Sequence, residues 1–380
     1  MIIGRLTVMA LMLMKTQIAP LNHVHPKPTW TVALYKPFLR DRGGFQGPPE
    51  RNRSCGVARW DEAHILIYSL TSARRLGIRK PGEMTEGTWA FSIQIIRTGD
   101  GVVEQSVTIP AGGINSELAV VAGGIVESDR DHLLFYSRQF KRINQAFKYA
   151  PLHGPEEFFQ EGTISDPEYL YVTNDQKTLL LIDSSGRRSH VFVFSGTDFK
   201  LRSDWLLEDV DWHDISIGDE GLLYRGFETP NHAYWTRFDG RTWEWNVALP
   251  VQRRCISPVY IDKDRVLNVC DPLTILGRDN STLIYKGAKK ERVQPPAVIS
   301  PDKRLAAVFR YAFKGGGIWD TTEYRTNVNL LIARLDDEHK TCDIPVVPMP
   351  RSQLAFNFAS DSTLIVLNDG NVAAYKLVCP

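Results

Sequence analysis

The sequence lacks several features that would assign it to a class of proteins at once. No apolar run reaches the roughly 18 residues that a membrane-spanning helix requires, so the sequence predicts no transmembrane segment. The 380 residues carry a formal net charge of only +1, which provides no overall field for nucleic acid or a membrane surface. Helical patterns are scarce, and the clearest two are Phe140–Tyr149 and Pro155–Gln160.

Motifs of catalysis are missing as well. The chain contains no Gly-x-Ser-x-Gly, no His-Glu-x-x-His and no Cys-x-x-Cys sequence. The run Gly315–Gly317 is not followed by the Gly-Lys-Ser/Thr of a phosphate-binding loop, so it is read as a flexible connection. No nucleophile paired with a base can be recognised from spacing, and the sequence predicts no bound organic cofactor.

What the sequence does contain is a repeated phrase, in which an aspartate precedes a run of strand-forming residues by three or four positions. The aspartates are Asp61, Asp129, Asp175, Asp219, Asp262, Asp302 and Asp361. Further strand-like runs, several followed by Gly and Asp turn residues, lie between these phrases. Seven units of about 50 residues, built from strands only, are typical of propeller blades.

We therefore predict an all-β fold, a seven-bladed propeller of four-stranded antiparallel blades that covers residues 27–380. The repeated aspartates are expected in the turns between the first and second strands, where a carboxylate accepts the N–H two residues on. The last unit provides only three strands before Pro380. The strand-like segment Trp30–Tyr35 is expected to supply its outer strand and to close the ring.

The N-terminus has a different composition from the rest. Arg5 precedes the apolar stretch Leu6–Met14, an order that resembles a short secretory signal. Lys15 follows immediately, and no clean cleavage site of small residues is visible. The prediction is a leader over residues 1–26 and export to the periplasm or the extracellular space. The alternatives are a misassigned start codon or a frayed terminus, and then a cytoplasmic protein.

One unit carries a family resemblance. The segment Ser300–Val308, with the sequence SPDKRLAAV, resembles the S-P-D-G-K-x-L phrase of bacterial WD40-like and TolB-type seven-bladed propellers. The likeness is clear in this unit and weak in the others. It implies the propeller fold, but no site, because proteins of that family use one scaffold for many functions.

Long segments of the sequence are expected on one face of the propeller. Turns within the A–B and C–D strand pairs share one face, and the B–C and D–A loops share the other, which we call the long-loop face. Loops on a rigid frame are where binding residues usually lie. The binding residues predicted on this face are Arg40, Arg42, Arg51, Arg53, Arg74, Arg75, Arg79 and Trp319. They suit a protein partner or a small polar or anionic ligand, and the alternative is neutral drift in tolerated loops.

The segment Glu208–Asp214 is the densest cluster of potential metal ligands. Asp209, Asp211 and His213 offer oxygen and nitrogen donors that suit a divalent cation, and alternation along an extended segment would place them on one side. The spacing matches no established metal motif. The alternative is a hydrogen-bonded loop at the entrance to a blade.

The five cysteines cannot all pair within one chain. In the blade assignment, Cys255 and Cys270 fall on the long-loop face of adjacent units, whereas Cys342 and Cys379 fall on the opposite face. We therefore predict the disulfides Cys255–Cys270 and Cys342–Cys379, with Cys55 free. The alternative is five reduced thiols in a cytosolic protein.

Three functional hypotheses follow from these observations. The first is a non-catalytic binding scaffold that uses the long-loop face. The second is a metal-dependent propeller hydrolase of the lactonase or esterase kind, with the acidic cluster near the central channel. The third is a subunit of a cell-envelope assembly that uses the sides of the blades.

Overall fold

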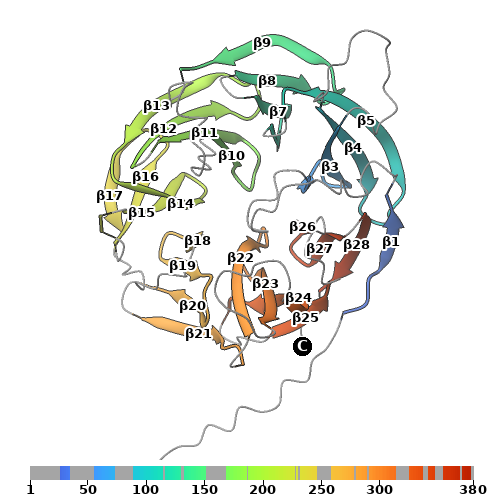
Figure 1. The fold of residues 1–380 in the computed structure, drawn as a ribbon, viewed down its shortest axis with the longest axis vertical. Helices are drawn as coiled ribbons and strands as arrows, with labels where there is room; N and C mark the ends of the chain where they lie inside the picture. The colour runs from blue at the N-terminus through green and yellow to red at the C-terminus, as the bar shows by residue number, and fades with distance from the viewer. Residues whose placement is uncertain are drawn as a thin grey trace, which may run out of the picture.

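Seven four-stranded antiparallel sheets are arranged as blades around a central axis, as predicted from the repeats (Figure 1). The structure, a computed structural model, describes residues 26–34, 55–72, 89–113, 116–129, 132–150, 168–185, 187–226, 228–229, 232–245, 258–277, 280–288, 291–313, 325–336, 341–346, 354–368 and 370–377. In each blade the strands are called A to D, from the axis outward.

The strands follow the chain around the ring. Blade 1 consists of β2 (Cys55–Arg59), β3 (His64–Ser72), β4 (Trp89–Arg97) and β5 (Val103–Ala111). Blade 2 consists of β6 (Glu117–Val121), β7 (Gly124–Asp129), β8 (His132–Ser137) and β9 (Arg142–Lys148). Blade 3 consists of β10 (Glu168–Val172), β11 (Thr178–Ser185), β12 (Arg188–Ser195) and β13 (Leu201–Leu207). Blade 4 consists of β14 (Val210–Ile217), β15 (Gly221–Gly226), β16 (Ala233–Arg237) and β17 (Thr242–Trp245). Blade 5 consists of β18 (Pro258–Asp262), β19 (Arg265–Asn268), β20 (Leu273–Leu276) and β21 (Ser281–Tyr285). Blade 6 consists of β22 (Glu291–Ile299), β23 (Leu305–Phe313), β24 (Arg325–Arg334) and β25 (Thr341–Pro345). Blade 7 consists of β26 (Leu354–Ser360), β27 (Thr363–Asn368), β28 (Asn371–Lys376) and β1 (Trp30–Ala33).

The B strands read as continuous apolar runs because each lies between two neighbouring blades. In β3, Ile65 and Ile67 pack against blade 7, whereas Leu66 packs toward blade 2. All three are at most 1% exposed. Burial on both faces removes the usual alternation of polar and apolar residues, and the apolar surface stabilises blade against blade.

The turn aspartates act as predicted in four blades. A side-chain oxygen of Asp61, Asp175, Asp262 and Asp302 accepts the backbone N–H two residues on, at 2.8, 3.0, 3.0 and 3.1 Å. In blade 6, the Ser300 hydroxyl also donates to Asp302 over 2.6 Å. These bonds satisfy amide groups that the tight turn leaves without a strand partner.

The N-terminal strand closes the ring as predicted. β1 pairs antiparallel with β28, and Trp30 lies opposite Ala374. On the other side, the indole N–H of Trp30 donates to the carbonyl oxygen of Thr98 in blade 1 over 2.8 Å. The ring of Trp30 lies against Gly101, where a Cβ atom would come within 2.7 Å of it. One short strand therefore joins the last blade to the first.

In blade 2 the repeated phrase was assigned to the wrong turn. The residue Asp129 ends β7, the B strand, and the following run is β8, the C strand. The A–B turn of this blade is made by Ala122 and Gly123, and it contains no aspartate. A Cβ at Gly123 would come within 2.4 Å of the Thr197 carbonyl oxygen of blade 3. The close approach of the next blade therefore explains why a glycine occupies this turn.

The helix predicted over Phe140–Tyr149 is wrong. Most of this segment forms β9, the outer strand of blade 2, and Phe140 lies in the preceding turn with φ at 59°. Phe140, Ile143 and Phe147 have helical spacing, but Phe147 and Tyr149 also alternate as a strand requires, and both pack into the interface with blade 3. The second predicted helix, Pro155–Gln160, lies outside the described residues.

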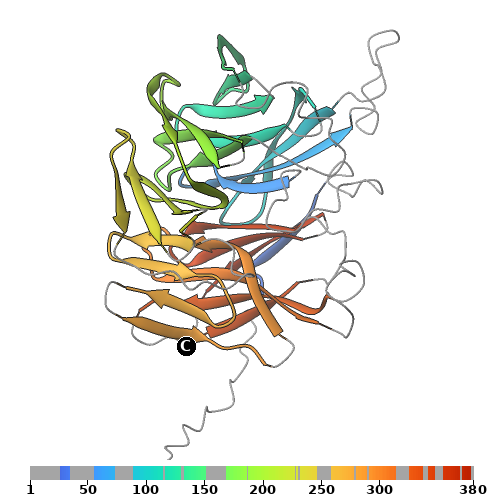
Figure 2. The ribbon, with the colours of Figure 1, turned by 60° about the vertical axis from the view of Figure 1, so that its left-hand side comes forward.

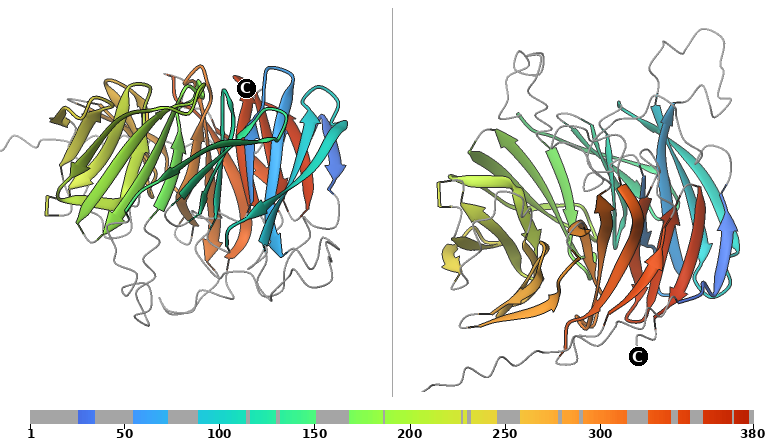
Figure 3. Two further views of the ribbon diagram at one scale, coloured as in Figure 1. Left: turned by 90° about the horizontal axis from the view of Figure 1, so that it is seen from above. Right: turned by 60° about the horizontal axis from the view of Figure 1, so that its bottom comes forward.

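The two faces of the ring differ in the length of their connections. Hairpin turns between coloured strands gather along one face when the ring is viewed from its side (Figure 3, left). We call this the short-turn face. A turned view shows the blades standing around the axis with their outer strands at the circumference (Figure 2). Within the described part of the chain, no helix is long and apolar enough to cross a membrane.

Deleting residues 1–36 should expose the edge of β28 and the apolar surface that β1 covers. We expect aggregation, or a melting temperature that is lower by several degrees, because unpaired strand edges associate. Deletion of residues 1–25, which keeps β1, is the matched control and should behave as the full chain. A monomeric protein with unchanged melting after the longer deletion, measured by light scattering and calorimetry, would contradict ring closure by β1.

Candidate functional site

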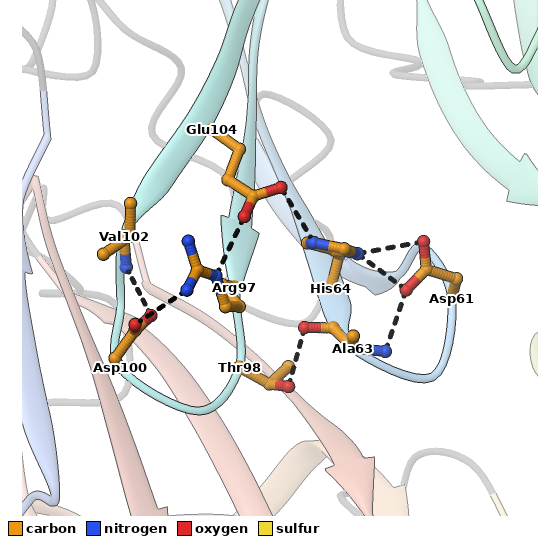
Figure 4. A network of polar contacts seen from close by, with 8 residues as sticks. All are labelled: Asp61, Ala63, His64, Arg97, Thr98, Asp100, Val102 and Glu104. Carbon is orange, nitrogen blue, oxygen red and sulfur yellow. Dashed lines mark hydrogen bonds and ion pairs between the residues drawn. The ribbon is translucent and has the colours of Figure 1, made fainter.

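Polar groups on the short-turn face of blade 1 satisfy one another in a continuous chain (Figure 4). His64 lies between two carboxylates, with Nδ1 2.8 Å from Asp61 and Nε2 3.0 Å from Glu104. Arg97 continues the chain, bonding Glu104 at 2.8 Å and Asp100 at 3.1 Å. Partial burial raises the pKa of Asp61, but the Ala63 amide and His64 outweigh this effect and hold it below the ordinary value. The network leaves little polar capacity for a ligand.

Two side chains bridge blades that are not neighbours, around the axis on the short-turn face. Gln176 of blade 3 donates from Nε2 to the Arg59 carbonyl oxygen of blade 1. Lys303 of blade 6 bonds Asp219 of blade 4 over 2.6 Å, and its ammonium lies 5.7 Å from the ring centre of Tyr260 in blade 5. Gln176 and Lys303 have φ near 60°, a conformation that costs non-glycine residues energy. The bridges tie the inner turns of these blades together.

A cavity of about 230 Å³ lies beside the bridge between Gln176 and Arg59, along the inner strands of blades 1, 2, 3, 6 and 7. Val57, Leu118 and Val172 contribute apolar surface to its walls, but polar groups, which include Asn174 and Asn357, contribute the larger share. Both side-chain ends of Asn357 already bond the backbone, at Val57 and Phe358. The channel therefore offers a small space whose walls are of mixed polarity, in which the Asn357 side chain is already bonded.

A larger cavity, of about 440 Å³, lies between blades 1 and 2. Ile109 and Pro110 of β5 form one wall, and Leu134 and Tyr136 of β8 form the other. The fully buried Glu127 lies in this wall and accepts hydrogen bonds from the Gly112 N–H and the Tyr136 hydroxyl, both at 3.0 Å. Apolar walls with a few placed polar groups are the usual character of a small-molecule site. We call this cavity the interblade pocket.

The B strands bring buried polar side chains toward the long-loop face in six blades. They are Ser69, Glu127, Asp183, Arg225, Asn268 and Arg310. Arg310 donates to Asp343 over 2.8 Å and to the Tyr285 hydroxyl over 2.8 Å, and that hydroxyl donates to Glu291 over 2.8 Å. Buried polar groups of this kind are stable only when they are bonded. They form a polar layer at the ends of the B strands.

The binding residues predicted on the long-loop face lie outside the described residues. This applies to Arg40, Arg42, Arg51, Arg53, Arg74, Arg75, Arg79 and Trp319. The strands that flank the segment with Arg74, Arg75 and Arg79 are described, because β3 ends at Ser72 and β4 begins at Trp89. The assignment of these eight residues to a binding face therefore stays a prediction.

The acidic cluster is only partly described. Asp209 connects β13 to β14 with φ at 55°, and its Oδ1 accepts the Glu228 N–H over 2.7 Å. Asp211 and His213 lie within β14, whose pairing with β15 shifts between Asp211 and Ile215, so regular alternation does not extend across the cluster. The side chains of Asp211 and His213 are outside the description. Among the described side chains, no group of three potential ligands is placed to hold a metal ion.

The cysteines divide into bonded and free. Cys270 and Cys342 are each in a disulfide bond, whereas Cys55 is a free thiol and is buried. Burial raises the pKa of Cys55 to about 12, so the thiol stays protonated and is a poor nucleophile. The predicted partners, Cys255 and Cys379, lie outside the described residues, and the pairing stays a prediction.

Sequence reasoning did not identify the residues that bridge blades across the ring or those that line the two cavities. Lys303 could have been noticed, because it occupies the position of glycine in the S-P-D-G-K-x-L phrase. A lysine at a position that favours glycine indicates that its side chain makes a specific contact. Glu127 and Arg142 had no such signal. They line the interblade pocket only because two blades bring distant segments together.

Comparisons with known proteins show the fold. No protein-family model matches the sequence, and no characterised protein matches it at a significant level. Among solved structures, it is similar to U3-55K, with 12% identity, a TM-score of 0.51, and coverage of 86% of this chain and 97% of that one. The RRP9 WD40 repeats share 12% identity and a TM-score of 0.51, over 92% and 100% of the two chains.

A third similar structure is Hsv2 of Kluyveromyces lactis with its loop 6CD replaced by a Gly-Ser linker. It has 11% identity and a TM-score of 0.50, over 83% of this chain and 90% of that one. Identities this low show the architecture and nothing about activity. The chain thus has the fold of a seven-bladed β-propeller and is similar in structure to WD40 propellers.

Peptide mapping without reduction should recover Cys255 with Cys270, Cys342 with Cys379, and Cys55 alone. We also expect Cys55 to resist alkylation in the folded protein, since it is 3% exposed and its raised pKa disfavours the thiolate. Mass spectrometry before and after denaturation measures both. Recovery of five free thiols from oxidised protein, or rapid labelling of Cys55 in the native state, would reject this arrangement.

Proposed function

We propose that this protein is a non-catalytic binding scaffold and that its partner contacts the long-loop face. The observation that carries the proposal is the contrast between the two ends of the blades. On the short-turn face, turn carboxylates and neighbouring charges satisfy one another, as in the chain from Asp61 to Asp100. At the opposite end, buried polar side chains lie at the ends of the B strands, and the sequence between the strands is long enough for recognition.

The composition of those segments suggests the kind of partner. The seven arginines predicted on the binding face, together with Trp319, suit an acidic protein surface or a small anionic ligand. Arginine forms bidentate hydrogen bonds with carboxylate and phosphate groups. The net charge of +1 gives no support to a nucleic-acid partner. A protein partner fits the extended, loop-bearing end of a rigid ring best.

A second candidate surface is supported by exposed apolar residues on the sides of blades 3 to 5. Leu201 and Leu206 on β13, Trp243 on β17 and Leu283 on β21 are 40–53% exposed. Trp243 lies opposite Trp235, and Leu283 lies opposite Thr274, so both face the space between blades 4 and 5. Exposed apolar patches often mark interfaces. This surface suits the assembly subunit among the three hypotheses.

Export of the protein is part of the proposal. The disulfide-bonded Cys270 and Cys342 support an oxidising compartment, and the apolar stretch after Arg5 supports a leader. The phrase at Ser300–Val308 supports a relation to bacterial TolB-type propellers. These three features agree with a protein that acts in the cell envelope or outside it.

The proposal is tested by affinity capture with three variants of the full chain. Arg74, Arg75 and Arg79 changed together to Glu should abolish capture of the partner, because reversed charge repels an acidic surface. The matched control changes Lys177, Arg241 and Lys263 to Glu on the short-turn face, where they are 69–88% exposed, and should retain the partner. All variants should melt as the wild type, since surface changes cost within about 0.5 kcal/mol each.

The third variant changes Trp243 and Leu283 to Lys and examines the blade sides. Loss of the partner from this variant alone would move the binding surface to the sides of blades 4 and 5. Loss from the short-turn control alone, or equal capture by all variants, would overturn the long-loop proposal. Quantitative mass spectrometry of the captured proteins gives the comparison.

A further inference from the structure

The interblade pocket has an identifiable structural origin. The outer strand β5 presents Ile109 and Ala111 toward blade 2, where they belong to the apolar interface. The facing residue Leu134 is only partly covered, because its partner on the outer strand β9 is Ala146, which has a single methyl group. The register between β8 and β9 also shifts between Leu134 and Tyr136. Part of the apolar surface between blades 1 and 2 is therefore left open.

The wall near the short-turn end of the pocket is held in place. Phe140 stacks on Trp60 of blade 1, with ring centres 5.3 Å apart and planes at 6°. The Arg138 guanidinium lies 4.1 Å from the same indole and donates to the carbonyl oxygens of Trp60, Val121 and Ala122. These contacts fix the Phe140 ring before any ligand arrives, and preorganisation of this kind reduces the cost of binding.

The charges of the pocket are unequal at its two ends. Glu127 is fully buried, and it accepts bonds from the Gly112 N–H and the Tyr136 hydroxyl. Arg142 lines the end of the pocket away from Glu127, where it pairs with Tyr136 across β8 and β9. Its side chain is exposed and forms no ion pair with any described residue. A negative group is therefore repelled near Glu127 and attracted near Arg142.

We propose that the interblade pocket binds a small amphipathic molecule, with an apolar body and one carboxylate. The body lies against Ile109, Leu134 and Phe140, and the carboxylate meets the guanidinium of Arg142. The volume of about 440 Å³ is within the range of small-molecule sites and suits a medium-length chain or an aryl group. This site is separate from the long-loop face and goes beyond a protein-binding role.

Isothermal titration of the full chain with decanoate tests the site, with decanol and decylamine as companions of the same length. We expect saturable 1:1 binding of decanoate, weaker binding of decanol and the weakest binding of decylamine. Arg142→Gln should weaken decanoate binding by about tenfold and leave decanol unchanged, because only the charge-assisted bond is lost. Ala146→Phe should cover Leu134, fill the pocket and abolish binding of both.

The matched control is Arg202→Gln, an exposed arginine on β13, the outer strand of blade 3, which should bind decanoate as the wild type does. The variant with Arg74, Arg75 and Arg79 changed to Glu should also bind normally, which separates this site from the long-loop face. Absence of 1:1 binding would overturn the proposal, as would equal affinity for decanoate and decylamine. Unchanged affinity in folded Arg142→Gln would do the same.

Discussion

The pairing of β1 with β28 is the interaction on which the rest of the structure depends. A propeller has no stable open form, because an unclosed ring leaves a strand edge and one face of two blades in water. Two backbone N–H groups at the ends of β1, those of Thr29 and Leu34, donate to the last blade over 2.8 Å. Trp30 contacts blade 1 from the same strand. Strand β1 thus completes blade 7 and joins it to blade 1.

A closed frame explains why recognition is expected at loops and between blades rather than in the strands themselves. B strands such as β3 are buried on both faces, so their residues have packing roles. The bridges made by Gln176 and Lys303 tie inner turns together at one end of the ring, and hydrogen-bonded turns occupy the surrounding surface. Space remains where one outer strand covers its neighbour poorly, as Ala146 does opposite Leu134.

Local physics made the architecture predictable from the sequence, whereas the sites depend on contacts between distant segments. Asp302 and Asp61 bond amides two residues away, so a short phrase is enough to recognise their turns. The same phrase at Asp129 precedes a C strand, so the phrase by itself does not specify which strand of a blade follows. The interblade pocket joins Ile109 to Leu134 and Arg142 across two blades. No local sequence pattern predicts that these residues line one pocket, or that the pairing of β9 with β8 shifts register.

Hydrogen exchange of the full chain, followed by mass spectrometry, tests ring closure most directly. If β1 completes blade 7, amides in residues 29–34 and in 370–376 exchange together and slowly, at rates close to those of the neighbouring strand β27. If residues 29–34 exchange as fast as an unstructured chain while β26 and β27 stay protected, the N-terminal strand does not close the ring, and closure must be achieved in another way.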